Sequence, residues 1–108
     1  MRDEASLFEF LTAHRISVFD PDTHAPVAQV TYRSDGTVAM RHADGREDCG
    51  QWGVDAGTYW TRYQNFRDGT LNRFYLEPID EKTAQAFFSD GRRAFIQTHR
   101  SVLKEPRQ

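Results

Sequence analysis

The chain has 108 residues, 14 basic and 16 acidic side chains, a net charge of −2 and an aromatic content of 13%. This length allows one domain with a single core, and the interspersed, nearly balanced charges disfavour nucleic acid and anionic membranes as partners. Because Phe, Tyr and Trp supply much of the apolar mass, the composition favours sheets over helical bundles. Cys49 is the only cysteine, which excludes an intramolecular disulfide and a cysteine-rich metal site and is typical of a reduced compartment.

The first residues predict a helix and no targeting segment. Leu7, Phe8, Phe10 and Leu11 recur at helical spacing, so we expect a short amphipathic helix over residues 3–14 that plugs or flanks a sheet. Acidic residues stand where a secretory signal would carry basic ones, and Glu9 interrupts the apolar run. We therefore expect neither a signal peptide nor a membrane span, and a cytoplasmic location.

The remaining chain predicts strands at regular intervals. Strand-like runs cover residues 15–20, 27–33, 38–42, 48–54, 59–66, 71–76, 83–89 and 93–101. Turn signals separate these runs at intervals of mostly about 8–12 residues, which is typical of an all-β meander. Five of the turns contain a glycine: Gly36, Gly45, Gly57, Gly69 and Gly91.

These intervals are too short for crossover helices, so each strand should pair with its neighbour, and closure would remove both sheet edges. The fold class is therefore mainly β: an eight-stranded antiparallel up-and-down meander barrel with one short N-terminal helix. We expect a single domain over residues 1–108, with the helix at 3–14, the meander at 15–101 and a flexible tail at 104–108.

Two tight turns determine which side chains line the lumen, the interior of this barrel. A G1-type bulge at Asp44 and Gly45 would place the Val38 face of one strand beside the Trp52 face of the next. A three-residue loop at residues 55–57 would then pair Trp52 with Trp60. We expect Trp52 to be buried.

After that loop, a type I′ turn at Asp68 and Gly69 would close a hairpin over residues 59–76. In the preferred register the lumen receives Trp60, Arg62, Gln64, Arg73 and Tyr75. A slip of one residue reverses the faces; the lumen then receives Tyr59, Tyr63, Phe74 and Leu76. Both registers stay open at this point.

The run DGT at 35–37 and the pattern G-x-W-x-V formed by Gly50, Trp52 and Val54 carry a resemblance to a known group. Over about half the chain, residues 36–75, the sequence resembles small bacterial calycin-type proteins, the lipocalin and streptavidin-like barrels of uncharacterised function. The resemblance implies a barrel with an internal pocket. In lipocalins the G-x-W motif lies on the first strand, whereas here it lies mid-chain, so no ligand residues are carried over.

Groups capable of chemistry are few. The four histidines show no metal-binding spacing, and we expect no metal and no cofactor. His24 should be exposed in a turn, and His14 should end the helix. His42 and His99 lie on predicted strands and, with Tyr75, are the candidates for catalysis. Cys49 has acidic neighbours that would raise its pKa, so we expect it to pack rather than to react.

Three functions fit these observations. The first is binding of a small, partly apolar or aromatic molecule, either neutral or anionic, in the lumen through the set Trp60, Arg62, Gln64, Arg73 and Tyr75. The second is a small barrel enzyme of isomerase, cyclase or decarboxylase type, using Arg and Tyr with a histidine. The third is a non-catalytic interaction module that forms a homodimer through its aromatic face.

Overall fold

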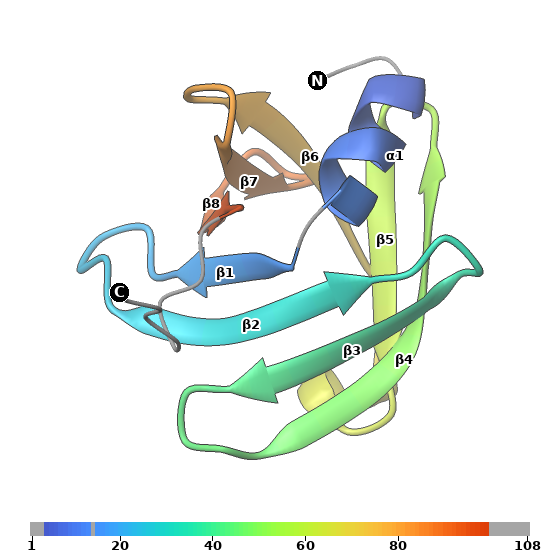
Figure 1. The fold of residues 1–108 in the computed structure, drawn as a ribbon, viewed down its shortest axis with the longest axis vertical. Coiled ribbons are helices and arrows are strands. Elements are labelled where there is room, and N and C mark those ends of the chain that lie inside the picture. The colour runs from blue at the N-terminus through green and yellow to red at the C-terminus, as the bar shows by residue number, and fades with distance from the viewer. Residues whose placement is uncertain (1–3, 14, 100–108) are drawn as a thin grey trace, which may run out of the picture.

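A computed structural model describes residues 4–13 and 15–99 and shows a closed, antiparallel barrel in which the first strand pairs with both the second and the last (Figure 1). The elements in chain order are α1 (Glu4–Ala13), β1 (Ile16–Phe19), β2 (Pro26–Tyr32), β3 (Thr37–His42), β4 (Glu47–Asp55), β5 (Thr58–Tyr63), η1 (Phe66–Gly69), β6 (Asn72–Pro78), β7 (Thr83–Phe88) and β8 (Arg93–Thr98). The predicted fold class is confirmed. The expectations for His14, for the end of the last strand beyond residue 99 and for the tail at 104–108 lie outside the described residues.

The β3–β4 turn has the predicted form. Gly45 has a φ of 95°, and the His42 N–H donates to the Arg46 carbonyl at 2.8 Å. The bulge places Val38 opposite Gly50 and Met40 opposite Asp48. The expected union of the Val38 and Trp52 faces is therefore confirmed.

The β4–β5 turn corrects the preferred register. Only Ala56 and Gly57 form the turn, with φ values of 53° and 83°, so Asp55 pairs with Thr58 and Trp52 pairs with Thr61. The predicted three-residue loop is wrong because Ala56 adopts a left-handed conformation that a non-glycine residue usually avoids. The Glu4 carboxylate accepts the Ala56 N–H at 2.7 Å and supports this conformation.

The one-residue difference reverses the faces of β5 and β6. The alternative register is the correct one: the lumen receives Tyr59, Tyr63, Phe74 and Leu76, all buried. The preferred register, with Arg62 and Arg73 in the lumen, is wrong.

The β5–β6 connection also differs from the prediction. Residues Phe66–Gly69 form η1 in place of the predicted two-residue turn, and Trp60 pairs with Arg73. The Asp48 carboxylate explains the longer connection, because it accepts the backbone N–H groups of Asn65 at 3.1 Å and Phe66 at 2.7 Å. A long-range hydrogen-bond acceptor thus overrides the local Asp-Gly turn signal.

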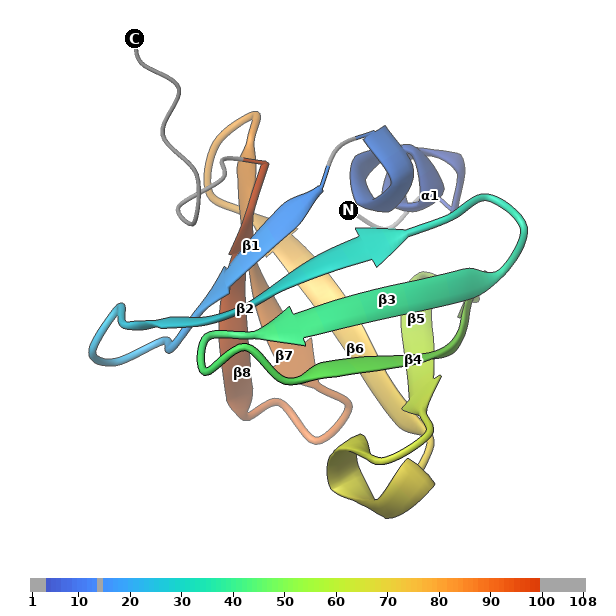
Figure 2. The ribbon, with the colours of Figure 1, turned by 60° about the horizontal axis from the view of Figure 1, so that its bottom comes forward.

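The two ends of the barrel are closed differently. Helix α1 covers one end, where Leu7, Phe10 and Leu11 are buried and Phe8 stacks on Trp52 at 5.4 Å. Trp52 is 3% exposed, as predicted. Element η1 lies at the opposite end in both views (Figures 1 and 2). The barrel therefore has one end filled by a helix and one end surrounded by loops.

Candidate ligand-binding site

A cavity of about 60 Å³ lies inside the barrel; we call it the lumen cavity. Its wall is mainly apolar, with side chains that include Val18, Ala28, Val30, Met40, Phe74 and Phe95. Val27, which is 39% exposed, also lines it, so the cavity reaches the surface at the end opposite α1. No Asp, Glu, Lys or Arg side chain of the described chain belongs to its lining.

Three polar side chains from distant strands meet inside the barrel. The Gln97 Nε2 group on β8 donates to the Tyr32 hydroxyl on β2 at 3.3 Å and to the Tyr59 hydroxyl on β5 at 3.1 Å. All three residues are buried, and Gln97 and Tyr32 line the lumen cavity. We call this group the Gln97 cluster.

The Gln97 cluster is neutral. Burial raises the pKa of Tyr32 to about 12, and burial also raises the pKa of Tyr59 well above its ordinary value. Both phenols therefore stay protonated near neutral pH. The lumen can offer hydrogen bonds and apolar surface but no fixed charge from these groups.

One atom of the cluster is unsatisfied. Within residues 4–13 and 15–99, Gln97 Oε1 is buried without a hydrogen-bond partner. Buried polar atoms are nearly always paired, since an unmet acceptor loses its hydration without compensation. An oxygen of this kind beside a cavity marks a position for a donor group.

The open end is bordered by His42 and Phe66. The Phe66 ring lies 5.5 Å from the His42 ring and 5.7 Å from the Tyr63 ring, measured between centroids. Asp48 holds the backbone of Phe66 in place through the hydrogen bonds described above. Burial alone would raise the pKa of Asp48, but hydrogen bonds from the N–H groups of Phe66, Cys49 and Asn65 outweigh it and keep the pKa below its usual value.

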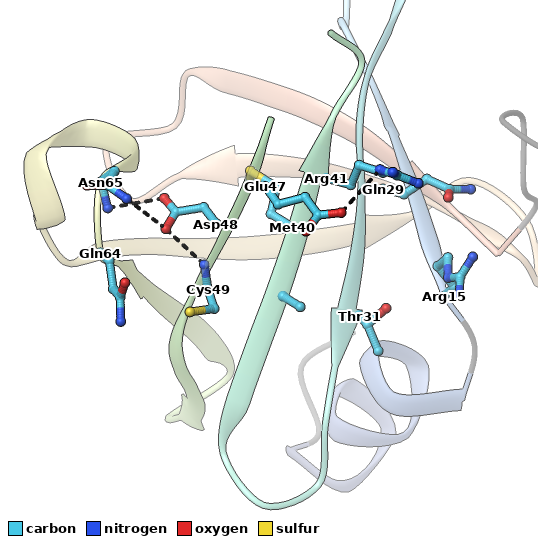
Figure 3. A pocket seen from close by; sticks show the side chains of 11 residues that line it. Arg15, Gln29, Thr31, Met40, Arg41, Glu47, Asp48, Cys49, Gln64 and Asn65 are labelled. Atoms are coloured by element: carbon cyan, nitrogen blue, oxygen red, sulfur yellow. Dashed lines mark hydrogen bonds and ion pairs between the residues drawn. The ribbon is translucent and has the colours of Figure 1, made fainter. Parts of the chain in front are cut away.

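A larger hollow of about 460 Å³ lies outside the barrel, over the outer faces of β2, β3 and β4; we call it the outer groove. Figure 3 shows its lining side chains along these strands, with Arg15 on one side of them and Gln64 and Asn65 on the other. Arg41 and Glu47 form an ion pair in it at 3.5 Å, with side chains 61% and 69% exposed. Cys49 is exposed in this groove, so the expectation that it serves in packing is wrong.

The predicted ligand-binding set lies on the outer face. Arg62 and Gln64 are exposed, and Trp60, Arg73 and Tyr75 are half-buried. Arg73 bonds to Thr58 Oγ1 at 3.0 Å and lies 3.7 Å from the Asp55 carboxylate, while Tyr75 stacks on Phe87 at 5.1 Å. Their expected place in the lumen is wrong. Ligand binding by these five residues on the outer surface stays a prediction.

The structure separates the histidine candidates. His42 lines the lumen cavity, whereas a ring nitrogen of His99 contacts the Phe10 carbonyl oxygen at 2.7 Å and its ring packs on Phe10 at 4.2 Å. His99 thus connects the helix to the end of β8. His24 is exposed with a φ of 63°, as expected for a turn. No catalytic role of His42, His99 or Tyr75 follows from these contacts.

Sequence reasoning missed the Gln97 cluster. Alternation along β8 places Gln97 in phase with Phe95, and this was the available signal, but its partners lie 65 and 38 residues away.

In the described ranges, no group of three His, Cys, Asp or Glu side chains could hold a metal ion. Nor does any described helix have the length and apolar character needed to cross a bilayer.

Comparison with known proteins gives no assignment: the chain matches no protein-family model, and no curated protein matches it significantly.

Proposed function

We propose that the protein binds a small, neutral, largely apolar molecule in the lumen. The observation that carries this proposal is the lumen cavity itself, which has apolar walls, a few convergent polar groups and access from the end opposite α1. The resemblance to calycin-type barrels agrees with it as an expectation. A cytoplasmic location, favoured by the lone cysteine, is part of the same proposal.

The cavity also limits the ligand. Its lining offers no cationic side chain among the described residues, so this proposal replaces the anionic ligand considered from sequence with an uncharged one. A volume of about 60 Å³ is smaller than the roughly 150 Å³ cavity that accommodates benzene. A ring-sized ligand would therefore need the Phe66 ring to move outward from the mouth.

Toluene is a suitable probe because it is apolar and small. Binding is measured by NMR titration of the wild-type protein and of two variants with the same change, Ala28→Leu in the lumen cavity and Ala39→Leu in the outer groove. We expect Ala28→Leu to weaken toluene binding at least about tenfold, because the larger side chain fills the cavity, and Ala39→Leu to leave it unchanged. Thermal melts check that both variants fold.

If Ala39→Leu weakened toluene binding and Ala28→Leu left it unchanged, the outer groove would be the binding site. Absence of toluene binding to the wild-type protein, together with absence of any co-purified small molecule in native mass spectrometry, would reject lumen binding altogether.

A further inference from the structure

We infer that the lumen ligand carries a hydroxyl group that donates a hydrogen bond to Gln97 Oε1 and accepts one from the Tyr32 hydroxyl. This inference rests on the proposed lumen binding and names the chemical class of the ligand: a neutral alcohol or phenol.

The first step is the orientation of the Gln97 carboxamide. Its Nε2 group lies 3.3 Å from the Tyr32 hydroxyl oxygen and 3.1 Å from the Tyr59 hydroxyl oxygen and donates to both. The carboxamide oxygen, Oε1, therefore faces away from the two phenols and is buried without a hydrogen-bond partner among the described residues.

The second step is the remaining hydrogen-bonding capacity. The two protons of Nε2 go to Tyr32 and Tyr59, and Oε1 has no partner in the described chain. The Tyr32 oxygen accepts a hydrogen bond from Nε2, so the Tyr32 hydroxyl can donate its own proton to a further acceptor. The free acceptor and the free donor belong to two groups already in contact, and a single hydroxyl group can satisfy both.

The third step is the absence of charge. The carboxamide and the two phenols are neutral, and the other walls of the lumen cavity are apolar or aromatic except for the neutral Thr61 side chain and His42 at the mouth. An ionised ligand would lose its hydration without a counter-charge inside the barrel. A neutral hydroxyl avoids this loss, while the rest of the ligand contacts apolar walls.

The experiment compares phenol with toluene, which have nearly the same shape but differ in the hydroxyl group. Their dissociation constants are measured for wild type, for Gln97→Met and for the control Gln85→Met, where the same change is made on β7 at a glutamine bonded to the Ala86 and Phe95 carbonyls. We expect the preference for phenol over toluene to fall about tenfold in Gln97→Met, the effect of one buried hydrogen bond, and to stay at the wild-type value in Gln85→Met.

Tyr32→Phe gives a second test that removes the donor and keeps the ring, and it decides the matter if Gln97→Met does not fold. We expect the phenol preference to fall severalfold. An unchanged preference in the variants that fold would overturn the inference and would indicate that water satisfies Gln97. Stronger binding of benzaldehyde, which only accepts hydrogen bonds, than of phenol would also overturn it. If neither phenol nor toluene binds the wild-type protein, the proposed lumen function itself fails.

Discussion

The lumen cavity and the outer groove differ in volume and in the state of their polar groups. The larger of the two is not the better candidate for a ligand-binding site. The outer groove is the larger, about 460 Å³ against about 60 Å³, but its charges face water, and Arg41 and Glu47 already pair with each other. The lumen cavity is small, but the Gln97 Oε1 atom beside it is buried without a hydrogen-bond partner in the part of the chain that the structure describes. A hydrogen bond to a buried, unsatisfied oxygen contributes more than a polar contact at an exposed surface, where bulk water competes for the same groups. Unsatisfied buried groups are therefore a better guide to a site than volume.

Replacing the two tryptophans by alanine should give the largest difference in stability between the inner and outer faces of the barrel. Trp52 packs between Phe8 and Tyr32 and donates through Nε1 to the Arg33 carbonyl at 2.8 Å, whereas Trp60 lies half-buried on the outside. We expect Trp52→Ala to lower the free energy of unfolding by about 3–5 kcal/mol and Trp60→Ala by about 1 kcal/mol. Urea denaturation measures both values. Equal losses would contradict the assignment of faces.

Two glycines of β4 give the next largest contrast. A Cβ atom on Gly50 would lie 2.0 Å from the Arg62 carbonyl oxygen, which belongs to the backbone of the neighbouring strand. A Cβ atom on Gly53 would lie 2.8 Å from Trp60 Nε1, which belongs to a side chain that can move. We expect Gly50→Ala to lower the free energy of unfolding by about 3 kcal/mol and Gly53→Ala by about 1 kcal/mol or less. If Gly53→Ala proves the more damaging in urea melts, the close approach of β4 and β5 is described incorrectly.

Substitutions of Asp48 and its neighbour Glu47 show how much the hydrogen bonds at the open end of the barrel contribute to stability. Asp48→Asn should lower the free energy of unfolding by about 1 kcal/mol, the usual value of a capping carboxylate, while Glu47→Gln should have a smaller effect because Glu47 is exposed. The pKa of Asp48 is depressed in the folded protein. Its contribution is therefore complete above the unfolded-state pKa of about 3.9 and is lost as the pH falls through the lower, folded-state pKa.

The pH dependence supplies the control for this prediction. The stability difference between wild type and Asp48→Asn should be constant near neutral pH and should shrink below about pH 4. Denaturation at a series of pH values measures it. A difference that grows toward low pH would have the wrong sign for a depressed carboxylate.

The smallest effect is expected at Arg62. This side chain is exposed on the outer face and donates through Nε to the Gly69 carbonyl at 3.3 Å. We expect Arg62→Ala to change the free energy of unfolding by less than about 0.5 kcal/mol and to leave the affinity for toluene unchanged. Loss of toluene binding in this variant would favour the outer set formed by Trp60, Arg62, Gln64, Arg73 and Tyr75 over the lumen.

Local sequence determined the architecture. The helix, the eight strands and the bulge at Gly45 follow from residue spacing and turn chemistry within a few positions of each other, so they could be predicted. The burial of Trp52 followed from the same alternation. Such signals are reliable because a glycine at positive φ or an apolar alternation acts on its own segment.

Tertiary structure decided the faces and the site. Ala56 adopts its left-handed conformation beside Glu4, and η1 forms where Asp48 accepts backbone N–H groups from residues 17 and 18 positions away. The Gln97 cluster joins three strands across the interior. Each of these features depends on a hydrogen bond between distant segments, which exists only once the barrel has closed. A one-residue change in a turn is locally small in energy but moves every following side chain to the other face, and for that reason the sequence alone left the lumen lining open.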